Sequence, residues 1–325
     1  MKKYNILHIS PTPLVASPQK ISHSLNQFSD TYTSNCIIFS DYPNKLNNLF
    51  SANSINFQNL KELSLQLISD ADIIHVHNFL SLEQEDILLN NVKSSCKFIL
   101  QIHSPLREGP LFVEYGNESK IKYDKKCVVG QYHTRLFPKY TMVPNLVLDK
   151  PSVNLIKDDE IPVVLFSPSH SRTGGRWNDK TAPELEEILK SLHKLDIIEL
   201  KLISNVKPYE LFQIRRKSHI SIDEIITGSY HQVSLESLAC GNVTINNSDF
   251  FSNLTLKNMV NSDDEVPFFK LSLDGCKTEL LKLVNDKKLI RDYQQKSFDY
   301  YSKHLNIEKL TNHYINIYNE VINND

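Results

Sequence analysis

Apolar and polar residues follow two alternating patterns along most of the chain. Short runs rich in β-branched and aromatic residues predict strands over residues 5–9, 35–39, 73–77, 97–103 and 126–130, and again over 163–167, 199–204, 220–223 and 243–246. Between them, apolar residues recur every three or four positions and predict amphipathic helices over residues 19–28, 59–68, 182–195, 208–217 and 231–239. The stretch from about residue 280 onward reads as helix almost throughout. Strands that alternate with helices predict parallel sheets built from right-handed crossovers.

This alternation is interrupted once, near residues 144–162, where Pro144, Pro151 and Pro162 flank the charged run 157–160. A chain of 325 residues is about twice the size of one ordinary domain. We therefore predict two Rossmann-like, doubly wound α/β domains, residues 1–147 and 148–304, with the last helix (305–325) packing back on the first domain. Ligands of such sheets bind beyond the carboxyl ends of the strands, so we expect the site in a cleft between the domains.

The composition excludes several classes of function. The 36 Lys and Arg residues nearly balance the 38 Asp and Glu residues, for a net charge of −2, so we expect no nucleic-acid partner. The chain has only 8 glycines and contains neither G-x-G-x-x-G nor G-x-x-x-x-G-K-[ST]. The common dinucleotide and P-loop sites are therefore absent from the sequence.

The sequence also favours one compartment. Its first apolar run is too short for a signal peptide, and no stretch approaches the about 20 apolar residues of a membrane span. The five cysteines form no C-x-x-C pair and predict reduced thiols. We expect a cytoplasmic protein. The basic residues Lys120, Lys122, Lys125 and Lys126 could give peripheral contact with the inner face of the membrane, although a solvated loop explains them better.

Two segments of the second domain carry most of the candidate chemistry. Segment 167–180 follows a predicted strand and gathers Arg172, Arg176 and Lys180 around its Gly-Gly pair. Fixed cations of this kind stabilise a departing diphosphate; the alternative is a solvated polar loop. Segment 228–241 becomes a helix in which Glu236 has apolar neighbours at helical spacing. A ribose diol would supply donors to this carboxylate, and the loop amides before the helix would face a phosphate. The alternative for Glu236 is a buried pair with an arginine.

The first domain offers weaker candidates. Ser17 is predicted as the N-cap of the first helix, where backbone amides would meet a phosphate or sugar, and a plain capped turn is the alternative. His103 ends an apolar strand and could donate to a sugar hydroxyl or phosphate oxygen, or serve only as a structural histidine. His75 and His77 alternate along one strand, so they should share one face of the sheet. Asp70-Ala71-Asp72 looks like a metal clamp, but it lies at the amino end of that strand, and we expect no metal there.

The C-terminal half resembles glycosyltransferase family 4 and the related group 1 enzymes of the GT-B fold. Three motifs carry the resemblance in the right order: Ser167-Pro168-Ser169-His170 with the basic stretch after it, the segment 221–231, and Leu235-Glu236-Ser237-Leu238-Ala239-Cys240-Gly241-Asn242-Val243, which is similar to L-E-A-M-A-x-G-x-P-V. The N-terminal half matches more weakly, through residues 71–77, His103 and Val143-Pro144-Asn145.

The resemblance implies roles for individual residues. Arg176 and Lys180 would hold the donor diphosphate, with Arg172 and Gly175 in the same loop, and Glu236 would hold the ribose. The donor sugar and phosphates would lie beside Ser229, Tyr230, His231 and Gln232. His103 would stand near the transferred sugar on the acceptor side, and Asn205 is our candidate for the base.

The sequence departs from the family pattern at four places. The first of the two family acids corresponds to Gly228, eight residues before Glu236. The basic pair is four residues apart rather than five, so Arg172 could take the place of Arg176. Ala16-Ser17-Pro18 stands at the glycine-rich loop, and Asn242-Val243 lacks the usual proline.

Together these features predict a metal-independent, retaining glycosyltransferase without a cofactor. Its co-substrate would be a nucleotide-sugar, with a UDP-sugar favoured, and its acceptor a glycan or lipid-linked glycan of bacterial surface polysaccharide or lipopolysaccharide assembly. No carboxylate pair for acid–base work stands out. The resemblance to retaining enzymes of this architecture implies that the leaving phosphate takes the acceptor proton. Two alternatives remain: a non-catalytic GT-B subunit that binds a glycan or partner enzyme, and a UDP-sugar 2-epimerase.

Overall fold

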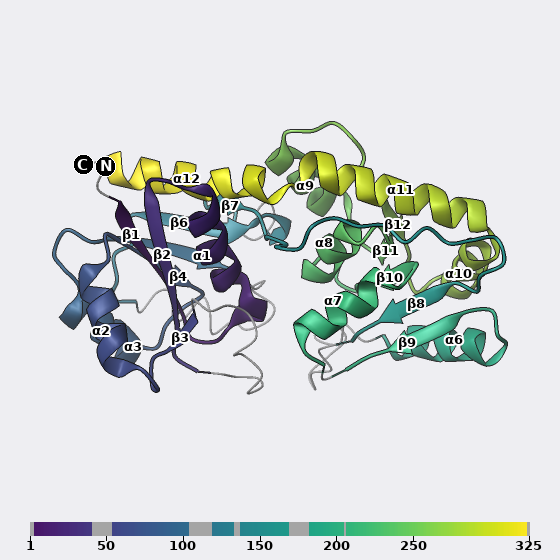
Figure 1. Ribbon diagram of the computed structural model, residues 1–325, viewed down its shortest axis with the longest axis horizontal. Coiled ribbons are helices and arrows are strands. Elements are labelled where there is room, and N and C mark those ends of the chain that lie inside the picture. Colours follow the sequence, from purple (N-terminus) through teal and green to yellow (C-terminus); the bar gives the residue numbers. More distant parts are fainter. Residues whose placement is uncertain are drawn as a thin grey trace. The chain divides into compact units, whose positions relative to one another are not determined.

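The computed structural model describes residues 3–40, 54–103, 119–132, 137–168, 182–204 and 206–323. Contacts within the chain divide it into two compact units. Unit 1 comprises residues 1–148 together with 307–325, and unit 2 comprises residues 149–306. Each unit is a parallel sheet with helices (Figure 1).

Unit 1 contains a seven-stranded parallel sheet with the strand order β3-β2-β1-β4-β5-β6-β7. Its strands are β1 Tyr4–Ser10, β2 Tyr32–Ile38, β3 Ser54–Asn56, β4 Ile73–His77, β5 Lys97–Ile102, β6 Lys125–Val129 and β7 Thr141–Val143. Its helices are α1 Ser17–Phe28, α2 Lys61–Asp70, α3 Leu82–Asn91 and α12 Ile307–Asn323, with short 3-10 turns η1 Leu14–Ala16 and η4 Gly130–Tyr132. Strand order reverses between β1 and β4, which is where ligands bind in doubly wound sheets.

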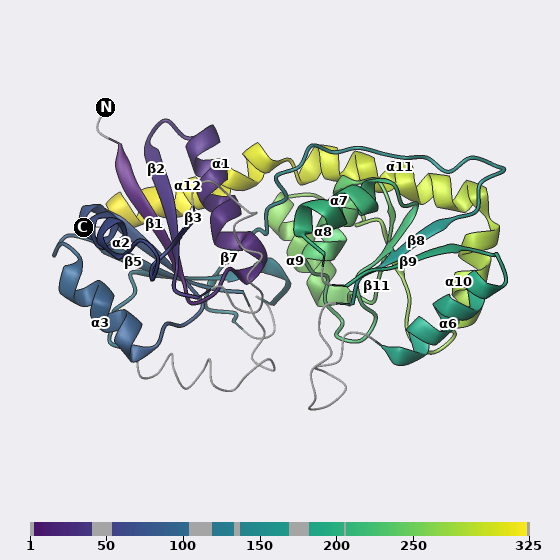
Figure 2. The same cartoon turned by 60° about the horizontal axis from the view of Figure 1, so that its bottom comes forward.

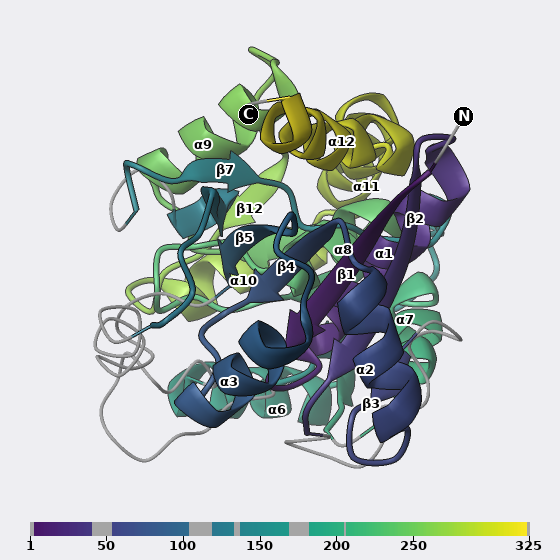
Figure 3. The same cartoon turned by 90° about the vertical axis from the view of Figure 1, so that its left-hand side faces the viewer.

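The two faces of the unit 1 sheet differ in polarity, because side chains alternate along each strand. One face is apolar and packs with residues of α2 and α3 such as Ile68 and Leu88. The other face is covered by α12, whose Tyr318 and Tyr314 reach His75 and Gln101. Figure 3 shows α12 on one side of the sheet and α2 and α3 on the other. The buried polar side chains on the α12 side of β1, β4 and β5 are His8, Ser10, His75, His77 and Gln101.

Unit 2 contains a five-stranded parallel sheet with the order β12-β11-β10-β8-β9. Its strands are β8 Val163–Phe166, β9 Glu199–Leu202, β10 Ile220–Ile222, β11 Val243–Asn246 and β12 Phe268–Lys270. Its helices are α6 Pro183–Lys194, α7 Pro208–Arg216, α8 Gln232–Ala239, α9 Phe250–Val260, α10 Cys276–Asn285 and α11 Lys287–His304. Strand order reverses between β8 and β10, so the loops after these strands flank the switch point of this sheet.

The last helices occupy different units. Figures 1 and 2 show α11 alongside the unit 2 sheet, where it packs on α8, α10 and β11. Helix α12 belongs to unit 1, where Asn319 accepts a hydrogen bond from the Tyr32 hydroxyl. Among the helices of the described ranges, none has both the length and the apolar character needed to cross a membrane.

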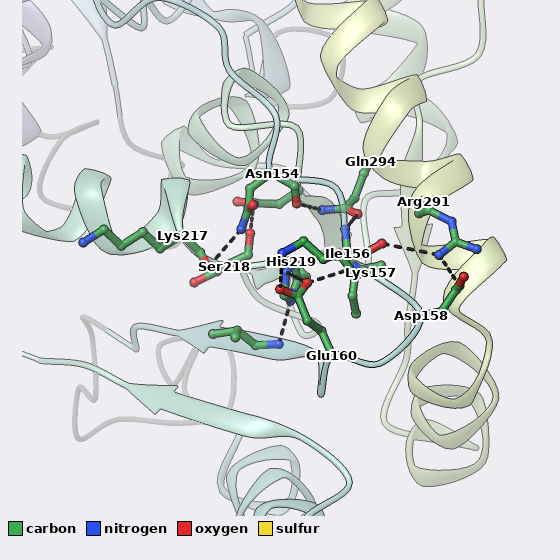
Figure 4. Close-up of polar contacts among 12 residues, drawn as sticks. Asn154, Ile156, Lys157, Asp158, Glu160, Lys217, Ser218, His219, Arg291 and Gln294 are labelled. Carbon is green, nitrogen blue, oxygen red and sulfur yellow. Dashed lines mark hydrogen bonds and ion pairs between the residues drawn. The ribbon is translucent and has the colours of Figure 1, made fainter.

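Residues 154–158 of the proline-marked segment before β8 are tied to helix α11 of unit 2. Gln294 of α11 accepts from the Ile156 amide at 3.0 Å and donates to the Asn154 carbonyl at 2.7 Å. Arg291, one turn earlier on α11, pairs with Asp158 at 2.6 Å (Figure 4). This part of the predicted domain boundary is therefore held against the second unit, whereas Pro144 at its start accepts a hydrogen bond from Tyr314 of α12 in unit 1.

Every strand and helix expected from the sequence forms, with ends shifted by a few residues at most, and the tail from residue 276 is helical as predicted. Among the strands and α-helices of the described residues, the prediction missed five: the three-residue strands β3, β7 and β12, and the helices α3 and α9.

Gly241 ends α8, as its position in the sequence predicts, and it does so with a φ of 59°. A Cβ at this residue would lie 2.7 Å from Cβ of Val153, whose segment crosses the end of the helix. At Gly275, which has a φ of 73°, a Cβ would meet nothing within 4 Å. Both glycines adopt the left-handed conformation, but only at Gly241 would a Cβ also clash with a neighbouring residue.

We predict that Gly241→Ala lowers the free energy of unfolding by about 2–5 kcal/mol, the sum of left-handed strain and overpacking. Gly275→Ala serves as the control and should cost only about 1–2 kcal/mol, because strain alone applies there. Urea unfolding of the two variants measures the difference. Equal losses at the two positions would show that the contact with Val153 does not constrain the fold.

Candidate functional site

Part of the predicted site lies outside the described residues. This applies to the whole cationic loop and to the candidate for the base, namely Arg172, Gly175, Arg176, Lys180 and Asn205. Their roles stay predictions. The loop follows β8, whose last residue Phe166 pairs with Ile222 of β10. It therefore starts at the same sheet edge as the loop after β10.

The loops after β10 and β11 are hydrogen-bonded to each other at this edge. The Asn247 amide donates to the Glu224 carbonyl at 3.2 Å, and the Asp249 amide donates to the Gly228 carbonyl at 2.9 Å. The two loops thus form one surface at the carboxyl ends of adjacent strands, where doubly wound sheets bind ligands.

Asp223, directly after β10, caps helix α8. Its Oδ2 accepts from the His231 amide and from the Ser234 hydroxyl, both at 2.7 Å. Burial alone would raise the pKa of Asp223, but the nearby His231 and the hydrogen bonds from His231 and Ser234 lower it below its ordinary value. The start of α8 therefore already holds an anion. The expectation that loop amides there face a phosphate fails at His231, because Asp223 takes that amide.

The neighbouring Glu224 is fully buried and organises the turn that follows it. Its Oε2 accepts from the amides of Ile226 at 2.6 Å and Thr227 at 2.8 Å, and its Oε1 accepts from the Thr227 hydroxyl. Each bond fixes a loop atom, so Glu224 shapes the loop between β10 and α8.

Gly228, which stands where the family pattern has its first acid, has a φ of 76°. Any other residue would be strained in this conformation. A Cβ there would lie 3.3 Å from Oδ2 of Asp249, whose Oδ1 caps α9 by accepting from the Ser252 amide. Gly228 therefore occupies a left-handed turn, and the Asp249 carboxylate from the next loop lies beside it.

The residues predicted beside the donor sugar divide into two groups. Tyr230 is only 1% exposed and its ring lies 5.9 Å from that of Phe268, so its side chain belongs to the core rather than to a ligand site. Ser229 is buried as well. His231 and Gln232 are partly exposed at the start of α8, where a ligand could reach their side chains.

Glu236 forms the ion pair that the sequence analysis weighed as its alternative role. Its Oε2 pairs with Nη1 of Arg215 on α7, and Gln232 donates to its Oε1 at 3.3 Å. Arg215 is completely buried, whereas the Glu236 side chain is 17% exposed. The pair fixes the Glu236 carboxylate in place, while the side chain as a whole keeps some contact with solvent.

The loop after β1 is strained. Leu14, Val15 and Ala16 all have φ between 49° and 61°, a conformation that costs about 1–2 kcal/mol for each residue with a Cβ. Helix α1 starts at Ser17 itself, and no side chain caps it. The N-cap prediction for Ser17 was therefore wrong, because the 3-10 turn η1 leads straight into the helix. Its ligand role stays a prediction. Backbone strain of this kind collects at functional sites.

The predicted strand-end histidine, His103, belongs to a buried histidine cluster. Its Nε2 lies 2.8 Å from Nδ1 of His77, and Nε2 of His77 lies 2.8 Å from Nδ1 of His8. The rings of His75 and His77 stack at 4.4 Å, so the two share one sheet face as predicted. Nδ1 of His75 is 2.8 Å from the Tyr318 hydroxyl of α12.

Burial keeps these histidines neutral. It lowers the pKa of His103 from 6.5 to about 3, and burial together with the charge of His103 does the same for His8. Burial also places the pKa values of His75 and His77 well below 6.5, with the neighbouring histidines adding to the effect. The cluster therefore consists of imidazoles that each carry one donor and one acceptor.

The pair Asp70 and Asp72 lies at the amino end of β4, as predicted. Asp72 accepts from the Asn5 amide at 2.8 Å and pairs with Lys93 at 2.5 Å. These contacts join β1, β4 and the segment before β5 at the amino edge of the unit 1 sheet.

No family model matches the sequence, and no curated protein matches it significantly. Solved structures nevertheless share its fold. A glycosyltransferase from Rickettsia africae has a TM-score of 0.61 at 13% identity, with 100% of both chains covered. An α-glucosyltransferase in complex with UDP-glucose and abasic DNA has a TM-score of 0.60 at 12% identity, covering 94% of this chain and 96% of that one. A Listeria monocytogenes protein described provisionally as a UDP-N-acetylglucosamine 2-epimerase has a TM-score of 0.55 at 11% identity, covering 97% of this chain and 95% of that one.

Identities this low show the fold alone. The chain has the GT-B fold of two doubly wound α/β domains, which confirms the predicted fold class. The predicted cleft between the domains stays a prediction.

We predict that the histidine cluster makes unit 1 sensitive to acid. The unfolded chain binds a proton on each of the four histidines as the pH falls below about 6.5, whereas the folded protein binds them only near pH 3 or lower. Stability is therefore complete above pH 6.5 and is lost as the pH falls, by up to about 1.4 kcal/mol per pH unit for each histidine.

Thermal unfolding at intervals from pH 7.5 to 4.5 measures this dependence. His75→Leu removes one titrating group and should flatten the slope even though it weakens the protein at pH 7.5. A melting temperature that does not change with pH over this range would contradict the prediction.

Proposed function

We propose that this protein is a glycosyltransferase that moves a sugar from a nucleoside-diphosphate donor, with UDP favoured, to a glycan or lipid-linked glycan of a bacterial surface polysaccharide. One observation carries the proposal: Glu236 and the loops after β8 and β10 stand at the switch point of unit 2, in a fold shared almost end to end with glycosyltransferases.

The contacts of Glu236 are compatible with a ribose ligand. Arg215 and Gln232 both contact the Glu236 carboxylate, and the side chain of Glu236 is 17% exposed. In our proposal this carboxylate accepts a ribose hydroxyl while it stays paired with Arg215. That pairing also fixes the carboxylate before the ligand arrives, which reduces the entropy lost on binding.

The negative charge of Asp223 opposes the binding of a diphosphate at the start of α8. Because this ionised carboxylate occupies the start of α8, a diphosphate approaching the same helix meets a negative charge. Cations must outweigh that repulsion. Our proposal assigns this to Arg176 and Lys180, with Arg172 beside them, because their loop starts at the same sheet edge. Their charges would also stabilise the departing diphosphate, whose phosphate oxygen would take the acceptor proton in a retaining transfer.

The carboxylates at this edge bear on the epimerase alternative, which needs groups for proton transfer. Asp223, Glu224 and Asp249 gather near Gly228, but each holds a helix start or a turn through its oxygens. Capping roles of this kind favour transfer of the sugar over its epimerisation. UDP-sugar isomerisation without an acceptor would support the epimerase, and failure of every nucleotide to bind would support a non-catalytic subunit.

Calorimetry with UDP, GDP and CMP tests the donor site. We expect UDP to bind and Glu236→Gln to weaken it by about 1.5–3 kcal/mol, since one charged hydrogen-bond acceptor is lost. The matched control is Glu279→Gln, the same change at an exposed side chain of α10, and this variant should bind UDP normally. Because Glu236 also pairs with Arg215, circular dichroism must first show that the variant is folded. Unchanged UDP affinity in Glu236→Gln would remove Glu236 from the site.

Steady-state kinetics with the donor identified in this way tests the cationic loop. Arg176→Ala should lower kcat/KM, and the corresponding activation free energy should rise by about 2–4 kcal/mol, the usual loss for a group that stabilises developing charge. Arg291→Ala is the control; it removes an arginine of α11 that pairs with Asp158. Near-normal kcat/KM in Arg176→Ala would contradict the assigned role.

A further inference from the structure

Three histidines form a hydrogen-bonded row across adjacent strands of unit 1. His8 stands on β1, His77 on β4 and His103 directly after β5, and each neighbouring pair is joined at 2.8 Å. His103 is partly exposed, whereas His8 and His77 are fully buried. The row therefore leads from the interior to the carboxyl edge of the sheet.

The protons of this row are not independent. A neutral imidazole has one N–H and one bare nitrogen, and His77 uses both nitrogens. It must donate to one neighbour and accept from the other. Only two arrangements satisfy this: every ring in the row carries its proton on Nδ1, or every ring carries it on Nε2.

Nε2 of His8 distinguishes the two arrangements. This atom is buried and has no hydrogen-bond partner among the described residues. With protons on Nε2, it would be a buried N–H without an acceptor, which is the rarer kind of unpaired group in proteins. With protons on Nδ1, it is a bare nitrogen, and every N–H of His8 and His77 is donated within the row.

We propose that His8 and His77 hold His103 as its Nδ1–H tautomer, so that His103 acts at the strand end as a hydrogen-bond donor and not as a base. The backbone of His103 is also fixed, because its amide donates to Oδ1 of Asn78 at 2.8 Å. The ligand of this donor rests on the proposed function: it would be a sugar hydroxyl or a phosphate oxygen. His77 and His8 are positioning residues.

A metal centre is the competing explanation, because His8, His75 and His77 have candidate ligand atoms within 4.8 Å of one another. A zinc ion lies in the plane of each ligating ring, at about 2 Å from its nitrogen. The rings of His75 and His77 are inclined by only 23° and stand 4.4 Å apart, so their planes do not meet at such a point. Both nitrogens of His77 are also engaged in the row.

Nitrogen NMR of the full-length protein labelled with ¹⁵N-histidine tests this inference, because protonated and bare imidazole nitrogens resonate far apart. The His103 signals are identified by their loss in His103→Gln. In the wild-type protein we expect His103, His77 and His8 each to be protonated on Nδ1. Protonation of His103 on Nε2, or averaging between both nitrogens, would overturn the proposal.

Two variants separate positioning from general packing. His77→Leu should release His103 to exchange between tautomers, while His75→Leu removes a histidine of the same face outside the row and should leave the His103 signals unchanged. The wild-type spectrum decides the question even if His77→Leu does not fold. Elemental analysis that finds one equivalent of zinc retained after dialysis would favour a metal centre. No readout depends on nucleotide binding or transfer, so the proposed function can fail without affecting the result.

Discussion

Parallel pairing is the constraint on which the rest of this molecule depends. Each strand must be followed by a crossover before its neighbour can pair with it, so all strands of a sheet end at the same edge. In unit 2 this brings together the loops after β10 and β11, and β8 ends at the same edge. In unit 1 it places the loop after β1 beside the row that ends at His103. Residues far apart in sequence become neighbours without any motif that joins them.

Polar groups buried behind these edges must be paired, and their pairing fixes the site. Arg215 is satisfied in part by Glu236, and this ion pair fixes the carboxylate that we propose as the ligand of a ribose. In unit 1 the histidine face is closed by α12, whose Tyr318 reaches His75. The last helix of the chain therefore completes the interior of the first unit. The same burial that keeps the histidines neutral makes them a source of acid sensitivity and orders their protons.

Much of the fold could be predicted because most strands and helices show a clear hydrophobic repeat, every second residue in strands and every third or fourth residue in helices. The three-residue strand β7 is too short to show a period. In α9 the buried face includes Ser252 and Thr255, while Phe250 and Phe251 are exposed, so its hydrophobic pattern does not follow its burial. The site was harder to predict. Asp223 is the last residue of a predicted strand, and that position alone could have identified it, but its capping of α8 depends on tertiary contact. His8 could be matched with His75 only once the register was known.

The central claim is that the start of α8 and Glu236 form one wall of a nucleotide site. Amide NMR of the full chain during titration with UDP tests it most directly. We expect the largest shift changes at Gln232 and Glu236, at the edge of the sheet formed by β10 and β11. Shift changes confined to unit 1, or none at saturating UDP, would contradict the account.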